Sequence, residues 1–454
     1  MRNAVGSTEK RLARIKNKPG ISPFFSLIHH FEKGDHLQIY QRETFRESLK
    51  LSFMFFIANL FTLVFFVFAA RKLGVVDYSE LGVLLSIFFM FAAANNLLNI
   101  VIIKYLSEFI AKTQYGRISR FCDLYVKAAV LGGFIVFVTM GALSSVLADI
   151  MALRPAHIII LGALIWAFLV WNALMGVLNG LQYFTLLGLN KIFQAFFSAL
   201  IGLGLLFMGF GANGAILGMA VGTIIAIPLA IYSARDIFFI QPQKIGRLKI
   251  IEYLFPSVFI VLCVGIILNI DVPLLRYFLN SFESGSYAAV SLIGSIVFSF
   301  SMVSCMVMFP KVAQRASNGE KTGFLLKRAL IYVFYMCLGV TLLYFIFSKV
   351  IVRWVFGGEF MISQYIGVYA LAMSFLALSN VLIMYNLALE KRFLLYLVPL
   401  AALTEVFLIT VVHNTIWQVV VLIVTFQLLF LTILARFSES DLAFLDRIWQ
   451  RMRR

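Results

Sequence analysis

The sequence predicts an all-α integral membrane protein of about twelve transmembrane helices in two six-helix bundles. Of its 454 residues, 62% are hydrophobic and 13% are charged, whereas ordinary soluble domains have roughly 45–50% and about 25%. The apolar residues come in runs of about 20, the length that a helix needs to cross a hydrocarbon core, and not in the short alternating segments of a β-barrel. Lys and Arg gather between these runs, as they do in multi-pass membrane proteins.

Twelve apolar segments follow one another along the chain. They are Leu51–Ala70, Leu81–Ile103, Ala128–Leu147, Ile158–Leu178, Ile192–Phe210, Gly214–Ala234, Phe255–Leu275, Tyr287–Phe309, Ala329–Phe347, Ile366–Leu387, Phe393–Val412 and Trp417–Ala435. Basic loops are retained in the cytoplasm. With both termini cytoplasmic, 32 of the 38 Lys and Arg residues lie on the cytoplasmic side. A missed helix would reverse this bias, so we expect an even number of spans in the cell membrane and both termini in the cytoplasm.

The chain also resembles itself once, because segments 1 and 2 with the loop after them are similar to segments 7 and 8 with theirs. Each half then holds six segments, and an even number makes the repeats parallel, related by an axis along the membrane normal. The expected parts are a basic cytoplasmic extension at 1–48, a bundle at 49–234, a cytoplasmic linker at 235–250, a bundle at 251–436 and a basic amphipathic tail at 437–454.

Both flanks are candidates for helices that lie on the cytoplasmic face of the membrane. Ser22 and Pro23 are typical of a helix start, and Ser440 is placed to cap a helix whose arginines face anionic lipids. A basic tail that only sets the topology is the alternative for each flank.

Several other classes of function are disfavoured. A net charge of +17 favours nucleic-acid binding in a soluble protein, but here the basic residues flank apolar runs and set topology. The four cysteines, Cys122, Cys263, Cys305 and Cys337, lack CxxC spacing and support neither a disulfide framework nor a zinc site. Walker A, HExxH and DxD-like patterns do not occur, so we expect no catalytic residue, no metal site and no cofactor.

Five short motifs occur in order at the ends of the segments. They are Ala70–Gly74 with Tyr78–Gly82, Gly176–Phe184, Gly211–Ala215, Phe309–Lys311 and Phe356–Phe360. On these the sequence resembles the polysaccharide-transporter family of the multidrug/oligosaccharidyl-lipid/polysaccharide (MOP) exporter superfamily. The resemblance implies a non-enzymatic flippase that moves an oligosaccharide on a polyprenyl (pyro)phosphate by alternating access, with H⁺ or Na⁺ as the coupling ion and membrane lipids as partners.

Two acids stand inside apolar segments, where an ionisable group costs at least about 2.5–3.5 kcal/mol and calls for a reason. Asp271 lies near the outer end of segment 7, beside Pro273, and Glu405 lies halfway along segment 11. Each is a candidate for holding the coupling ion. A structural partnership with a polar group on a neighbouring helix is the alternative for both.

Two polar groups of other kinds are also candidates for contacts with substrate. Asn95, Asn96 and Asn99 fall within a sector of about 100° on segment 2, where they either form interhelical hydrogen bonds or line a sugar-binding cavity. Arg71, Lys72 and Arg276 stand at equivalent outer ends of segments 1 and 7. There they either attract the pyrophosphate of a polyprenyl-linked sugar or simply snorkel to the interface.

Two alternatives to the flippase stay open. A MATE-like multidrug antiporter would present acidic groups to organic cations, whereas the candidates here are mixed in charge. A membrane-embedded polysaccharide polymerase or glycosyltransferase needs a reaction chamber, usually supplied by a large outer loop. The outer loops here span at most about 20 residues, too few for a chamber of that kind.

The predicted topology is tested by reporter fusions. A reporter after Ala234 and one at Arg454 should both lie in the cytoplasm, because each follows an even number of spans. A reporter in the 211–214 turn should lie outside. A cytoplasmic signal from that turn would break the helix count at its fifth member.

Overall fold

The computed structural model describes the backbone of residues 37–111, 114–238, 240–243, 250–317, 319–357, 360 and 362–452, and in this part the chain forms helices and no strands. The helix expected at Ser22 and Pro23 lies outside the described residues. The helices are α3 (Leu37–Ala111), α4 (Tyr115–Ala142), α5 (Ser144–Ile150), α6 (Pro155–Gly180), α7 (Phe184–Phe207), α8 (Gly211–Phe238), α9 (Ile250–Asn269), α10 (Asp271–Phe278), α11 (Ser281–Ser317), α12 (Gly323–Val355), α13 (Ser363–Ala388), α14 (Leu394–Val411) and α15 (Ile416–Met452).

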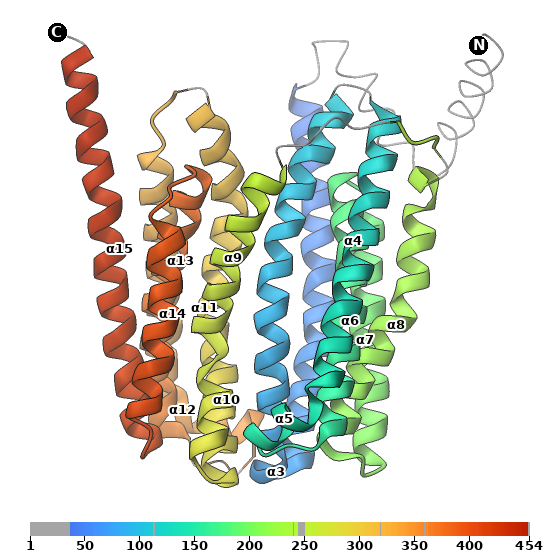
Figure 1. The fold of residues 1–454 in the computed structure, drawn as a ribbon, viewed down its shortest axis with the longest axis vertical. Helices are drawn as coiled ribbons and strands as arrows, with labels where there is room; N and C mark the ends of the chain where they lie inside the picture. Colours follow the sequence, from blue (N-terminus) through green and yellow to red (C-terminus); the bar gives the residue numbers. More distant parts are fainter. Residues whose placement is uncertain are drawn as a thin grey trace.

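The long helices run along a common axis, with α3 to α8 on one side of the molecule and α11 to α15 on the other (Figure 1). Within the described residues, ten helices are long and apolar enough to cross a membrane, and the bent pair α9 and α10 adds an eleventh. The chain is therefore a multi-pass membrane protein. This agrees with the predicted all-α class, and the predicted twelve spans follow once α3 is counted as two.

The helix α3 contains the first two predicted segments. Its apolar part, Lys50–Ala93, has 44 residues and would be about 66 Å long if straight, more than twice the roughly 30 Å of a hydrocarbon core. The backbone breaks at Gly74, which has φ 67° and ψ −179°, a conformation open to glycine and strained for other residues. The chain reverses there at one end of the molecule (Figure 1), called here the Gly74 end, which the topology predicts to lie outside.

The seventh predicted segment is one bent span formed by two helices. The helices α9 and α10 meet at Ile270 with a bend of 44°. Pro273 has no N–H and so leaves the carbonyl of Asn269 without its helical partner, which accounts for the break. Pro256 lies inside α9 without ending it.

Other boundaries differ from the sequence prediction. The helix α3 begins at Leu37 and α8 continues to Phe238, so both extend into stretches expected to flank the bundles. The short helix α5 at the Gly74 end was not expected. The tail also differs, because α15 continues to Met452 with no break at the cap expected at Ser440.

The two halves of the chain are joined chiefly through α3, which packs against α9, α10 and α11. Glycines allow α3 to come close to these helices. A Cβ at Gly82 would overlap the Ala288 side chain, and one at Gly285 would overlap the carbonyl oxygen of Val75. Small residues let membrane helices touch backbone to backbone, so the interface near the Gly74 end depends on these positions.

Replacing Gly285 by Val should weaken that interface, because overpacking a close contact costs about 1–3 kcal/mol. The matched control is Gly339→Val on α12, where an added Cβ meets nothing within 4 Å. Both changes replace a helical glycine by the same residue. In detergent, Gly285→Val should melt at a lower temperature than Gly339→Val, and equal melting temperatures would show that the interface tolerates side chains.

Candidate functional site

The break between α9 and α10 presents Asp271 at the first position of α10. Its Oδ1 accepts a hydrogen bond from the backbone N–H of Val272 at 2.9 Å. The carboxyl is 2% exposed, although the chain carries it inside an apolar span. A helix start favours a negative charge, so the local backbone is built to hold a carboxylate here.

Two tyrosines from other helices complete the shell of Asp271. The hydroxyl of Tyr287 on α11 donates to Oδ2 at 2.6 Å, and that of Tyr369 on α13 donates to the same atom at 2.7 Å. The rings meet edge to face with centroids 5.8 Å apart. The Oγ of Ser291 lies 3.1 Å from the Tyr369 hydroxyl. Asp271 therefore ties together α10, α11 and α13.

A second acid lies close by on α14. Glu405 is 1% exposed and near enough to Asp271 for the two carboxyls to interact electrostatically. The side-chain amide of Gln427 on α15 donates to its Oε1 at 3.3 Å. Its Oε2 and the Oε1 of Gln427 are buried acceptors without a donor. We call Asp271, Tyr287, Tyr369, Glu405 and Gln427 the acid cluster.

The acid cluster has no basic partner among the described residues. The ion pairs of that part of the chain involve other acids. Two buried carboxyls without a counter-charge are costly in a low-dielectric interior, and two unpaired acceptors add to the imbalance. A proton or a small cation corrects both, since Na⁺ and H⁺ are held by carboxylate, hydroxyl and amide oxygens. The cluster thus has the oxygen atoms that a proton or a small cation would need as ligands.

The basic residues at the Gly74 end have protein partners. Arg71 donates to the backbone carbonyls of Trp354 and of Val355 at the end of α12, where the helix dipole favours a cation. Lys72 lies over the ring of Phe207, 5.6 Å from its centroid. Binding of a pyrophosphate by these residues stays a prediction, while the contact of Arg71 joins the two halves.

Arg276 also joins the two halves, and unlike Arg71 it is buried at their interface. Its guanidinium donates to Ser79 on α3, to Ser284 at 3.5 Å and to the carbonyl of Ala152 at 3.2 Å. Glu80 supplies the opposite charge at longer range. The Nε has no partner. Because Ser79 and Ala152 lie in one half and Arg276 in the other, this arginine fastens the two together.

The asparagines of segment 2 are described in part. The side chains of Asn95 and Asn96 lie outside the described residues. Asn99 accepts a hydrogen bond from the hydroxyl of Tyr125 on α4 at 3.1 Å and packs on Gly176 of α6. For Asn99 the geometry favours the interhelical hydrogen bond, and the cavity wall stays a prediction.

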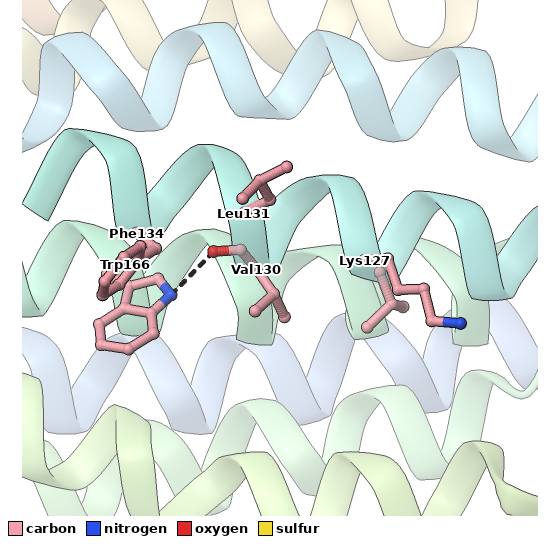
Figure 2. Close-up of a pocket in the computed structure, with 6 residues that line it drawn as sticks. Lys127, Val130, Leu131, Phe134 and Trp166 are labelled. Carbon is pink, nitrogen blue, oxygen red and sulfur yellow. Dashed lines mark hydrogen bonds between the residues drawn. The ribbon is translucent and has the colours of Figure 1, made fainter.

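A shallow groove lies on the N-terminal half, far in sequence from the acid cluster. Its lining is mostly apolar. Figure 2 shows it between α4 and α6, with the indole N–H of Trp166 donating to the carbonyl of Val130 at 3.1 Å. It has a volume of about 410 Å³ and is lined by Val126, Lys127, Val130, Leu131, Phe134 and Trp166. Leu131 is 62% exposed, so this is a face turned to lipid.

Sequence reasoning found the acids of the cluster and missed their partners. Tyr287, Tyr369 and Gln427 are uncharged, and tyrosine is common in membrane helices, so nothing marked them before the fold brought them together. The polar Gln427 in the middle of segment 12 was the one available signal.

Comparisons with known proteins agree with this architecture. No protein-family model matches the sequence, and no curated protein matches it. Solved structures do match, among them the lipid II flippase MurJ in an inward closed conformation, with a TM-score of 0.65 and 14% identity over 89% of this chain and 93% of that one.

Two other matches belong to the same superfamily. An inward-facing multidrug resistance MATE family transporter of the MOP superfamily has a TM-score of 0.62 and 14% identity over 86% of this chain and 96% of that one. A MOP superfamily transporter from Pyrococcus furiosus, whose binding pocket is described as having reverse polarity, has a TM-score of 0.63 and 15% identity over 88% and 96%. The predicted resemblance is confirmed in the fold, which is that of the MOP transporters.

Proposed function

We propose that this protein is a flippase that moves an oligosaccharide linked to a polyprenyl (pyro)phosphate across the cell membrane. The observation that carries the proposal is the acid cluster, a buried and uncompensated pair of carboxyls inside a MOP-type fold. Such groups in a membrane span are costly and mark ion pathways. The likeness to a lipid II flippase and the sequence motifs favour a lipid-linked substrate, handled without enzymatic chemistry.

The way the two halves meet supports alternating access. They touch along α3, with contacts that include Gly82 on Ala288 and the hydrogen bonds of Arg71 and Arg276. These contacts lie toward the Gly74 end, which the topology predicts to lie outside. We expect transport to break them while others form at the cytoplasmic end.

The acid cluster provides a means of coupling this change to an ion. It lies on α10, α11, α13, α14 and α15, all in one half, and α10 also packs against α3. Binding of a proton or Na⁺ changes the charge next to the bend at Ile270. The helix α10, which follows this bend, carries Arg276. The ion thus acts on the helix that fastens the two halves.

A MATE-like antiporter remains the second candidate, because buried carboxyls also suit an organic cation. The two proposals differ in the molecule that accumulates when the protein is lost. They share the fold, so only a substrate assay separates them.

Deleting the protein should leave its lipid-linked glycan on the cytoplasmic leaflet, because a large polar group does not cross the hydrocarbon core unaided. The measurement is the accessibility of the glycan to a membrane-impermeant enzyme in spheroplasts and in inverted vesicles. Glycan units on the outer leaflet of the deletion strain would remove flippase as the main function, and a greater sensitivity of that strain to organic cations would favour the antiporter.

Asp271→Asn should fold and reach the membrane but transport poorly, and its residual transport should lose its dependence on pH or Na⁺. Asparagine keeps the size of the side chain and can still meet the hydroxyls of Tyr287 and Tyr369, but it cannot titrate. Glu405→Gln should also lower transport and its dependence on pH or Na⁺. Transport in vesicles is measured across a range of pH and Na⁺ concentration.

The control is Asp149→Asn, which removes an exposed acid of α5 outside the cluster and should leave transport unchanged. Asp271→Leu distinguishes a structural role of this side chain from a role in coupling transport to an ion. If Asp271→Asn transports normally while Asp271→Leu only lowers the amount of protein, then Asp271 is a structural partner and the coupling proposal is wrong.

A further inference from the structure

A buried histidine at the start of α6 has a contact at each of its ring nitrogens. His157 is 3% exposed. The backbone N–H of Arg154 donates to its Nδ1 at 3.2 Å, and the backbone N–H of His157 donates to the carbonyl of Arg154 at 2.9 Å. Its Nε2 lies 3.6 Å from Oε2 of Glu80 on α3. Because Nδ1 is an acceptor here, the neutral ring carries its proton on Nε2, which faces the carboxylate.

Glu80 connects this histidine with the other half of the protein. The residue before it, Ser79, accepts a hydrogen bond from Arg276 of α10, and Glu80 itself acts on the guanidinium electrostatically. The side chain of Glu80 is 28% exposed, so protons can reach it from the water at the Gly74 end. Glu80 therefore interacts with a histidine of its own half and with an arginine of the other.

The loop between α5 and α6 connects the same histidine and arginine by a second route. Its Ala152 has φ 49°, a left-handed conformation that is uncommon for alanine and is kept only where the surroundings hold it. The carbonyl of Ala152 accepts a hydrogen bond from Arg276 at 3.2 Å. Two residues later, the N–H of Arg154 donates to His157. The imidazole thus holds the loop that binds Arg276.

Few charged groups act on His157. They are Glu80 of α3 and Arg154 of the loop before α6. The other helices that pack against α6 are α4, α5, α7 and α8. Three of these carry no charged side chain in the parts nearer the Gly74 end, which are 128–142, 192–207 and 211–234. The remaining charged residues of α3 and α5 near that end are exposed, namely Arg71, Lys72, Asp77 and Asp149.

Protonation of His157 disturbs both of its contacts. The imidazolium carries a second proton on Nδ1, which then faces the N–H of Arg154 as donor against donor. Its positive charge also competes with Arg276 for Glu80. The closed structure therefore fits the neutral ring, whereas separation of the halves frees Glu80 to pair with the imidazolium. Since the separated form binds the added proton more tightly, a lower pH shifts the protein toward it.

We propose that His157 and Glu80 form a pH-sensitive latch, which holds the two halves together at the Gly74 end while the ring is neutral and releases them when it is protonated. The latch rests on the proposed function only in that these halves separate during transport. It goes beyond that function because it makes the closure itself respond to pH at the Gly74 end, through residues outside the acid cluster.

The test measures the separation of the halves at the Gly74 end by pulsed electron paramagnetic resonance. Spin labels are attached to Asp149→Cys on α5 and Phe282→Cys on α11 in the full-length protein in detergent. Both positions are exposed, while the four native cysteines are buried. Between about pH 8 and about pH 5, the ratio of molecules with the longer distance to those with the shorter one should rise about 3- to 10-fold.

His157→Gln should lose most of this rise. A glutamine at this position of a helix can accept the N–H of Arg154, as in a capping box, but it cannot titrate. The matched control is His413→Gln, which replaces the other histidine of the described residues. His413 stacks on Phe278 of α10 with ring centroids 3.8 Å apart, so the control also alters a contact of α10. It should keep the full rise, because it leaves the latch intact.

Equal rises in His157→Gln and His413→Gln would overturn the proposal, and so would a single distance at every pH in the unchanged protein. If His157→Gln does not fold, Glu80→Gln decides. Loss of the carboxylate leaves the imidazolium without its counter-charge, so the rise should move to a lower pH, and an unmoved rise would refute the latch. No transport is measured here, so failure of the latch leaves the deletion experiment to decide the flippase separately.

Discussion

The free-energy cost of burying a charge in a membrane limits where this protein can place its ionisable side chains. On insertion scales, one ionisable side chain at the centre of a span costs about 2.5–3.5 kcal/mol, a large share of the stability of any one domain. The chain nevertheless buries Asp271 and Glu405 in the C-terminal half. Neither acid has an opposite charge against it among the described residues.

The second constraint is the interface between the halves. The helix α3 provides nearly all the contacts of the N-terminal half, and its partners α9, α10 and α11 approach it closely at glycines. Buried apolar side chains of both halves belong to one core there. Arg276 adds hydrogen bonds to Ser79 and Ala152 across this interface. The two halves are therefore joined by polar contacts as well as by close packing.

Much of the fold was predictable because its signals are local. The run of apolar residues from Leu51 to Ala70 defines a span by its own length, and the alternation of Lys and Arg then fixes the even count. The sequence predicted a loop between the first two segments, whereas in the structure the two helical stretches of α3 meet directly at the non-helical Gly74. The split at Ile270 depends on the N–H that Pro273 lacks, whereas Pro256 lies inside α9 without ending it.

The candidate site was predictable only where a residue is unusual by itself. Asp271 and Glu405 stood out because an acid in an apolar run is rare, whereas Tyr287 and Tyr369 became significant through contacts across 16 and 98 residues of sequence.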